Sequence, residues 1–285
     1  MINSLDHLII AVKDLDEARI NYKKIFGIDP VWHGEHRELG TSNIIFNFKN
    51  TYLELLAANG SGIGSDFVNQ TIEDRGEGLV GSVLGSNNIK IVAAAIKDKG
   101  YLLGDISDGK GINSKNNEIR KWKNLFLPVE LTRGIFTFII EHKEGALPMP
   151  KHFDASFINK LDHVVISTND ADGFIEIYRD IYNIRLALDR VIEHWDTRIL
   201  FFRLNQTTIE VVEKDHDNKN PDELWGLAWE VDSIQSARER LIAEGVEITK
   251  IKEGIKENTI VATIKSHTHN CLLYTSDAAD ESRGV

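Results

Sequence analysis

The hydrophobic and polar pattern at the start of the chain predicts one strand, one helix and three further strands. Residues 5–12 are dominated by branched apolar side chains, which predict a strand. Asp14, with Glu17 three positions later, has the spacing of a helix-capping box, and apolar residues at helical spacing continue as far as Gly27. Three extended segments follow, at 28–32, 43–47 and 51–57.

The same pattern returns in the second half of the chain. His7 and Glu54 return as His163 and Glu210, both at an offset of 156 residues (163 − 7 and 210 − 54). Aligned without gaps at this offset, the 52 residues from position 5 onward share 13 identities with their second copy. Identity spread along one fixed offset indicates an internal duplication.

A weaker version of the unit follows each copy. A strand at 78–83 precedes a helix at 89–99, and a strand at 226–231 precedes a helix at 232–244. The predicted fold class is therefore α+β, with four strand–helix–three-strand units paired into two domains.

The domain boundary is predicted at Pro148-Met149-Pro150, because two prolines in three residues resist regular structure. Residues from Cys271 to Glu281 resemble the translation of a sequencing-library adapter, so we expect the tail to lie outside the fold and the second domain to lack its last strand. Resequencing the locus tests this. The expected parts are a first domain at 1–147, a linker at 148–158, a second domain at 159–270 and the tail at 271–285.

Composition and charge narrow the class of protein. Hydrophobic residues make up 42% of the chain and charged residues 27%, as in ordinary globular proteins. No apolar run approaches the roughly 20 residues of a membrane span, and the N-terminus lacks a secretory signal pattern. A net charge of −11 argues against a nucleic-acid partner. With Cys271 as the single cysteine, we expect a cytoplasmic protein.

Each copy has a strand that begins with Asp-His and a later strand with a central glutamate. This repeated pattern resembles that of the vicinal oxygen chelate superfamily, which includes glyoxalase I, extradiol dioxygenases and fosfomycin-resistance proteins. The resemblance implies that two units form a curved mixed sheet, a cup with helices outside and a divalent metal on its concave face. Metal ligands in that superfamily come from the first and last strand of each unit. The matching residues are His7, Glu54, His163 and Glu210, and such ligands suit Mn, Fe, Ni or Zn.

The first half is closer still to the glyoxalase-like branch of this superfamily. The matching segments are Gly34-Glu35-His36, Gly40-Thr41-Ser42-Asn43 and Tyr52-Leu53-Glu54-Leu55. The resemblance implies a substrate pocket lined by His36, Gly40, Thr41 and Asn43. The alternative is a loop stabilised by its own side chains.

Glu141 is the candidate catalytic residue, as a third metal ligand or the general base. The alternative is an exposed glutamate at the end of a strand. Alternation along the strand places His142 on the opposite face, which makes His142 the weaker candidate.

Two hypotheses about function remain. Positions where the superfamily brings a second His or Gln align with Leu79 and Leu227, and an aliphatic side chain cannot ligate a cation. The first hypothesis is a divalent-metal-dependent lyase or isomerase acting on a small oxygen-rich molecule. The second is a metal-free small-molecule-binding protein, similar to antibiotic-resistance proteins, in which His7 is hydrogen-bonded to Glu54. An extradiol-type dioxygenase ranks third. The expected partner is a small-molecule ligand, and the candidate assembly is a homodimer.

Overall fold

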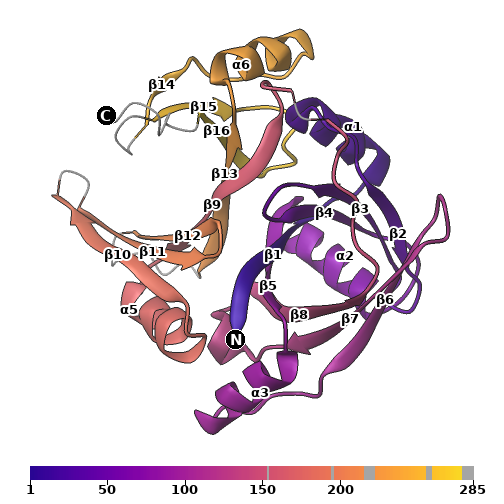
Figure 1. The fold of residues 1–285 in the computed structure, drawn as a ribbon, viewed down its shortest axis with the longest axis vertical. Helices are drawn as coiled ribbons and strands as arrows, with labels where there is room; N and C mark the ends of the chain where they lie inside the picture. Colours follow the sequence, from indigo (N-terminus) through magenta and orange to yellow (C-terminus); the bar gives the residue numbers. More distant parts are fainter. Residues whose placement is uncertain (153, 194–195, 215–221, 255–258, 278–285) are drawn as a thin grey trace.

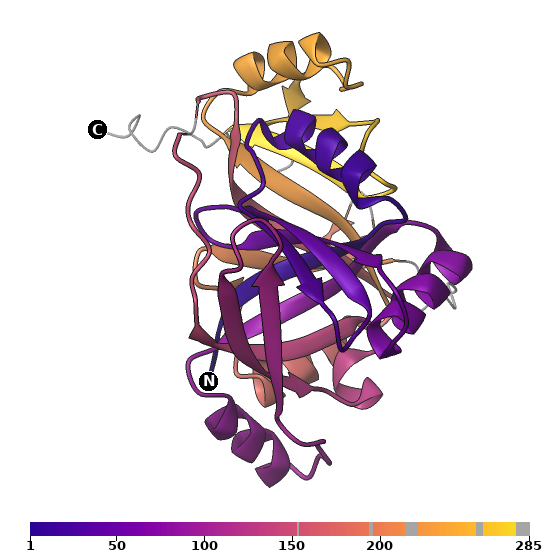
Figure 2. The same ribbon diagram turned by 90° about the vertical axis from the view of Figure 1, so that its right-hand side faces the viewer.

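The computed structural model of the chain describes residues 1–285 except 153, 194–195, 215–221, 255–258 and 278–285. Two eight-stranded sheets dominate the fold, one in each half of the chain, and helices pack around them (Figures 1 and 2). The predicted α+β fold class, with two curved mixed sheets, is confirmed.

The first sheet closes into a barrel in the order β1-β4-β3-β2-β6-β7-β8-β5. β2 and β6 complete the barrel through the pairs Gly34–Asn113 and Glu35–Ile112, whereas β1 and β5 pair along nearly their whole length. The expected cup of the first domain is thus a closed one. Its strands are β1 (Ile2–Ala11), β2 (Trp32–His36), β3 (Thr41–Asn47), β4 (Tyr52–Ala58), β5 (Gly78–Ser86), β6 (Ser107–Asn113), β7 (Ile119–Phe126) and β8 (Phe136–Glu144).

The second sheet stays open, in the order β10-β11-β12-β9-β13-β16-β15-β14. Figure 1 shows it as a curve whose two ends, β10 and β14, lie apart. Its strands are β9 (Ile158–Thr168), β10 (Arg185–Ile192), β11 (Thr197–Leu204), β12 (Thr207–Glu213), β13 (Glu223–Val231), β14 (Lys252–Glu253), β15 (Ile260–Ile264) and β16 (Leu272–Asp277).

The first helix begins and ends where the sequence predicts. The Asp14 carboxylate accepts the backbone N–H groups of Asp16 and Glu17, and Gly27 ends the helix with a left-handed φ of 79°. No helix of the described residues is long and apolar enough to cross a membrane. The helices are α1 (Leu15–Phe26), α2 (Ile63–Arg75), α3 (Ile89–Asp98), α4 (Val129–Thr132), α5 (Ala171–Phe174), the π-helix η1 (Ile175–Ile181) and α6 (Ile234–Ala243).

The helix α2 lies between Asn59 and Gly78, where the content of Gly, Asn and Ser predicts a loop, and that prediction is wrong. Its apolar residues are few, but Val68 is fully buried and packs with Ile9, Ala11 and Leu56 of the barrel. Burial against the barrel therefore stabilises a helix whose own sequence signal is weak.

The two domains share a continuous hydrophobic core between the sheets. The Phe26 ring of α1 packs 5.2 Å from the Trp229 ring of β13, measured between ring centres. The Asn50 side chain also acts as a substitute strand partner: it donates to the Leu161 carbonyl at 2.7 Å and accepts the Leu161 N–H at 3.0 Å. These contacts fix the orientation of one domain against the other.

Strand register supports the internal duplication. β1 pairs in parallel with β4, and β9 pairs in parallel with β12, so that Ile9 lies opposite Glu54 and Val165 opposite Glu210. β16 pairs in parallel with β13 and takes the place of the last strand of the second domain, although it lies within the segment 271–285 that we expected outside the fold. The adapter origin of that segment and the domain boundaries stay predictions.

Candidate functional site

The side chains of His7 and Glu54 meet on the inner face of the first barrel. The register of β1 and β4 places Ile9 opposite Glu54 and His7 opposite Tyr52. Cross-strand partners and residues two apart on a strand share a face, so these side chains point the same way. His7 Nε2 lies 3.4 Å from Glu54 Oε2, and the residues are only 3% and 7% exposed. The pair singled out by the sequence is thus brought together.

The other side of the His7 ring is held by a second carboxylate. His7 Nδ1 lies 2.7 Å from Asp6 Oδ1, and the other Asp6 oxygen lies 3.0 Å from His142 Nε2. The Tyr52 ring stacks on the His7 ring with 4.4 Å between centres and 12° between planes. His7 is therefore fixed by two carboxylates and one aromatic face.

Charge on these groups follows from their mutual contacts. Burial lowers the pKa of His7, but its hydrogen bonds with Asp6 and Glu54 outweigh burial and raise the pKa above its ordinary value. Burial raises the pKa of Glu54, but the hydrogen bond and charge of His7 outweigh it and lower that pKa to about 2. These contacts therefore favour the protonated imidazolium form of His7 between the two carboxylates.

We expect the stabilisation by His7 to decline above neutral pH. Because its pKa is raised above the ordinary value of 6.5, the stabilisation is fully present below that value and is lost as the pH rises through the raised pKa. The difference in unfolding free energy between the wild type and His7→Gln should therefore shrink as the pH is raised from below 6.5 into the alkaline range. Urea unfolding across this range measures it. His163→Gln is the matched control, and a constant difference for His7→Gln would contradict the ion-pair assignment.

Three of the four predicted pocket residues lie next to this cluster. Asn43 Nδ2 donates to Glu54 Oε1 at 2.7 Å and lies 3.4 Å from His36 Nε2, while His36 Nδ1 lies 3.1 Å from the Thr41 hydroxyl. Burial lowers the pKa of His36. His36, Thr41 and Asn43 therefore extend the polar network around Glu54.

Gly40, the fourth predicted pocket residue, has a backbone role in the structure. Its φ is 69°, and a Cβ there would lie 2.5 Å from the carbonyl oxygen of Ser61. The glycine is thus required by the close approach of the loop before α2. A direct ligand contact by Gly40 stays a prediction.

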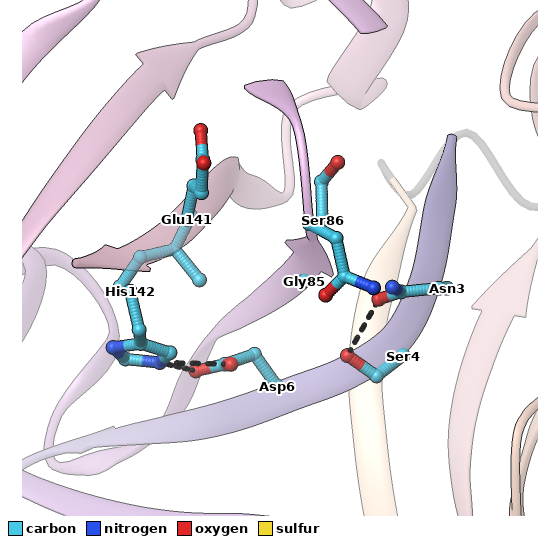
Figure 3. Close-up of a pocket in the computed structure, with 9 residues that line it drawn as sticks. Asn3, Ser4, Asp6, Gly85, Ser86, Glu141 and His142 are labelled. Atoms are coloured by element: carbon cyan, nitrogen blue, oxygen red, sulfur yellow. Dashed lines mark hydrogen bonds and ion pairs between the residues drawn. The ribbon is translucent and has the colours of Figure 1, made fainter. Parts of the chain in front are cut away.

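Glu141 is not part of the His7 cluster, whereas His142 is. The Glu141 carboxylate accepts the Ile89 N–H at the start of α3 at 3.1 Å and forms an ion pair with Lys143. In Figure 3 it points away from the His142 ring, which faces Asp6. The two residues lie on opposite faces, as expected, and His142 rather than Glu141 contacts the cluster; a catalytic role for Glu141 stays a prediction. The lining residues of a cavity of about 200 Å³ beside them are Asn3, Ser4, Asp6, Gly85, Ser86, Asn87, Ile140, Glu141 and His142.

The second domain repeats the pair in a more open setting. His163 Nε2 lies 3.3 Å from Glu210 Oε2, and His163 Nδ1 lies 2.9 Å from Asp162. The His163 side chain is 26% exposed, against 3% for His7. Burial raises the pKa of Glu210, the direction opposite to that of Glu54. The second copy keeps the contacts of the pair, but the pKa of its glutamate is shifted in the opposite direction.

A divalent metal in the first barrel would need ligands from the second unit, and the strand register shows which residues stand there. His7 lies opposite Val83 on β5, and Val83 and Gly85 lie opposite Phe138 and Ile140 on β8. Val83, Phe138 and Ile140 therefore occupy the positions that correspond to His7, Tyr52 and Glu54. None of these three side chains can ligate a cation.

The register corrects the sequence alignment that placed Leu79 and Leu227 at the ligand positions. Leu79 lies opposite Ile10, and Leu227 lies opposite Val164, so both face away from the histidines. The residue opposite His163 is Ala228. The conclusion that the second ligand is missing holds in both domains.

The residues around Glu54 do not fit a divalent metal. The Asn43 amide nitrogen lies between Glu54 and His36, where a cation would have to lie to bind both. Across the described parts of the chain, no group of three or more His, Cys, Asp or Glu side chains could hold a metal ion. His7 and Glu54 thus occupy two of the positions that we predicted for metal ligands, and the residues at the corresponding positions of the second unit are apolar.

Arg120 is the functional candidate that sequence reasoning missed. It lies on β7 with an exposed fraction of 6%, and its Cζ is 5.4–6.0 Å from the ring centres of Tyr52, Trp32 and Trp122. The signal was the alternation Arg120-Lys121-Trp122-Lys123, which places the arginine and the tryptophan on one face and the lysines on the other.

Two family models match the chain. A model described as a glyoxalase-like domain matches residues 5–159, and one described as the glyoxalase/bleomycin resistance protein/dioxygenase superfamily matches residues 162–263. No curated protein matches the chain.

Several solved structures share the fold at low sequence identity. A hypothetical protein from Staphylococcus aureus has a TM-score of 0.68 at 14% identity, covering 97% of this chain and 100% of its own. A 4-hydroxymandelate synthase variant from Streptomyces coelicolor has a TM-score of 0.68 at 13% identity, and the match covers 100% of this chain and 95% of the synthase. A Mn(II)-bound glyoxalase from Novosphingobium aromaticivorans has a TM-score of 0.63 at 12% identity, and the match covers 98% of this chain and 83% of the glyoxalase. These likenesses concern the fold alone.

Proposed function

The chain belongs to the glyoxalase-like domain family of the vicinal oxygen chelate superfamily, and we propose that its first barrel binds a small oxygen-rich molecule without a divalent metal. The main observation behind this proposal is that Val83 and Ile140 occupy the positions where the second unit would have to supply metal ligands, and both side chains are apolar. Polar groups in an apolar enclosure are typical of small-molecule sites. In the barrel these groups are His7, His36, Asn43 and Glu54.

His7 and Glu54 have a role in this site without a metal. The imidazolium N–H that faces Glu54 fixes one carboxylate oxygen, and the Asn43 amide fixes the other. Residues held in this way keep their orientation while a ligand binds and leaves. We assign the working site to the first domain because its cluster is buried and is surrounded by His36, Thr41 and Asn43.

The second candidate is the metal-dependent lyase or isomerase, favoured by the approach of His7 to Glu54. Metal analysis of protein purified under metal-replete conditions separates the two. We expect substoichiometric Mn, Fe, Ni and Zn, and no change in content for His7→Ala. One equivalent of a divalent ion, lost in both His7→Ala and Glu54→Ala but kept in His163→Ala, would establish the metal-dependent candidate instead.

Ligand binding provides an independent measurement. A thermal-shift screen of small hydroxy acids, keto acids and aromatic acids should give stabilising compounds whose effect survives treatment of the protein with EDTA. Binding abolished by EDTA and restored by a divalent cation would overturn the metal-free proposal.

A further inference from the structure

Arg120 places a positive charge inside the first barrel. Its strand, β7, pairs with β6 and β8, and its guanidinium carbon lies 5.6 Å from the Trp32 ring centre, 5.4 Å from that of Tyr52 and 6.0 Å from that of Trp122. Tyr52 also stacks on His7, so Arg120 and the His7 cluster share a wall of the site. Three aromatic rings thus surround a cation that is almost wholly shielded from water.

Arg120 has no carboxylate partner in the described parts of the chain. The buried carboxylates nearest the site, Asp6 and Glu54, are both engaged by His7, and no acidic oxygen of the described residues forms an ion pair with the guanidinium. A buried charge is ordinarily paired, because isolation from water is costly. Cation–π contacts with the rings offset only part of this cost.

Several polar atoms around the barrel interior also lack a partner. Arg120 Nε, Asn43 Oδ1 and Asn124 Oδ1 are buried without a hydrogen bond to any described residue. Arg120, Trp122 and Asn124 occupy every second position of β7, so their side chains share the inner face of the strand. Buried unsatisfied groups are uncommon in native structures and mark places where a ligand or water completes the bonding.

We propose that Arg120 is the anchor for a ligand carboxylate, so that the barrel binds a small carboxylic acid with a flat, unsaturated body. The guanidinium is a planar fork of N–H donors that matches the two oxygens of a carboxylate. The ligand carboxylate would also contact the guanidinium directly, which Asp6 and Glu54 do not do because both are engaged by His7. This inference rests on the proposed function and names its ligand class.

The rings around Arg120 select the body of the acid. Trp32, Tyr52 and Trp122 offer flat apolar faces, against which an aromatic or conjugated group packs better than a branched aliphatic one. Asn43 Oδ1 accepts hydrogen bonds, so a hydroxyl on the ligand has a partner there. The acid is therefore held by its charge at one end and by stacking along its body.

Benzoate, benzamide and acetate test this in the wild-type protein. Benzamide keeps the ring and removes the charge, whereas acetate keeps the charge and removes the ring. By isothermal titration calorimetry we expect benzoate to bind about 10- to 100-fold more tightly than benzamide, the value of a charge-assisted hydrogen-bond pair. Equal affinity for benzoate and benzamide overturns the role of the carboxylate, and equal affinity for benzoate and acetate overturns the flat body.

Variants locate the binding at Arg120. Arg120→Gln should bind benzoate about 10- to 100-fold more weakly than the wild type, with an unchanged affinity for benzamide. Arg120→Lys keeps the charge but not the planar set of N–H donors, so its affinity for benzoate should lie between those of the wild type and Arg120→Gln. Lys121→Gln is the matched control, since Lys121 is the neighbouring residue and pairs on the outside with Glu144. Undiminished benzoate binding by Arg120→Gln overturns the inference.

Failure of the inference and failure of the proposed function are distinguishable. No binding of benzoate to the wild type overturns the Arg120 inference, while ligands found in the EDTA-treated screen would still support a metal-free site. If Arg120→Gln does not fold, the comparison of benzoate with benzamide in the wild type decides alone.

Discussion

Replacing His7 by leucine should lower the free energy of unfolding by about 3–5 kcal/mol, because it leaves the Glu54 carboxylate buried without its counter-ion. Glu54 would keep only the Asn43 amide as a hydrogen-bond donor, whereas Asp6 would keep His142. Urea unfolding followed by tryptophan fluorescence measures the loss, since Trp32 and Trp122 lie in the same barrel.

The double variant His7→Leu/Glu54→Leu should be more stable than His7→Leu and lie within about 1–2 kcal/mol of the wild type, because an apolar pair of similar volume replaces a buried ion pair at little cost. The corresponding cycle at His163 and Glu210 is the matched control. Its coupling energy should stay below about 1 kcal/mol, because that pair is partly exposed to water. Additive losses in the His7 cycle would contradict the coupling.

The parts of the fold that could be predicted from the sequence are those carried by local spacing. Asp14 and Gly27 mark the two ends of α1 by their own chemistry, and both act as predicted. The repeat of the histidine and the glutamate at one offset predicts two like strand pairs, and the register of β1 with β4 and of β9 with β12 agrees. Such features need no knowledge of what lies across the sheet.

Which face of a strand turns inward could not be predicted where both faces are apolar. β8 carries Phe138 and Ile140 on one face and Ile139 on the other, and all three are buried. Alternation therefore separated Glu141 from His142 correctly but could not say which of them enters the barrel. Pairing of β8 with β5 and β7 makes that choice, and it selects His142.

Arg120 was missed for a related reason. Three of the five residues that follow Ile119 on β7 are basic, namely Arg120, Lys121 and Lys123, and such a density of charge is typical of a solvent-exposed edge strand. The barrel closes over β7 because β6 pairs with β2, a long-range contact that local spacing does not encode. Closure turns one of these cations inward, beside three aromatic rings, and leaves its neighbours outside.

The two sheets differ in closure, and this explains how one duplicated pair acquired two environments. In the first domain the β2–β6 pairing encloses His7, so its contacts with Asp6 and Glu54 are sheltered from water. In the second domain β10 and β14 end the sheet without meeting, and His163 stays partly exposed. Enclosure also restricts access to the site that we propose, and we expect a ligand to enter where the short β2–β6 ladder opens.

Locking β2 to β6 should slow ligand association with the first barrel by about tenfold or more, because binding that requires a conformational change is limited by that change. The change is the double variant Glu35→Cys/Ile112→Cys. These residues lie directly opposite each other on antiparallel strands, where the Cα separation suits a disulfide. β2 and β6 share the shortest ladder of the barrel and lie next to Trp32 and Arg120, so opening there exposes the site.

Stopped-flow fluorescence with a ligand from the thermal-shift screen measures the association rate in the oxidised and reduced forms. The rate should recover on reduction, and the natural cysteine, Cys271, is buried and far along the chain from the new pair. Lys110→Cys/Lys121→Cys is the matched control, because it joins β6 to β7 without bridging β2. Equal rates in the oxidised and reduced forms of the β2–β6 variant would show that ligands enter elsewhere, with the cavity beside Asp6 and His142 as the next place to test.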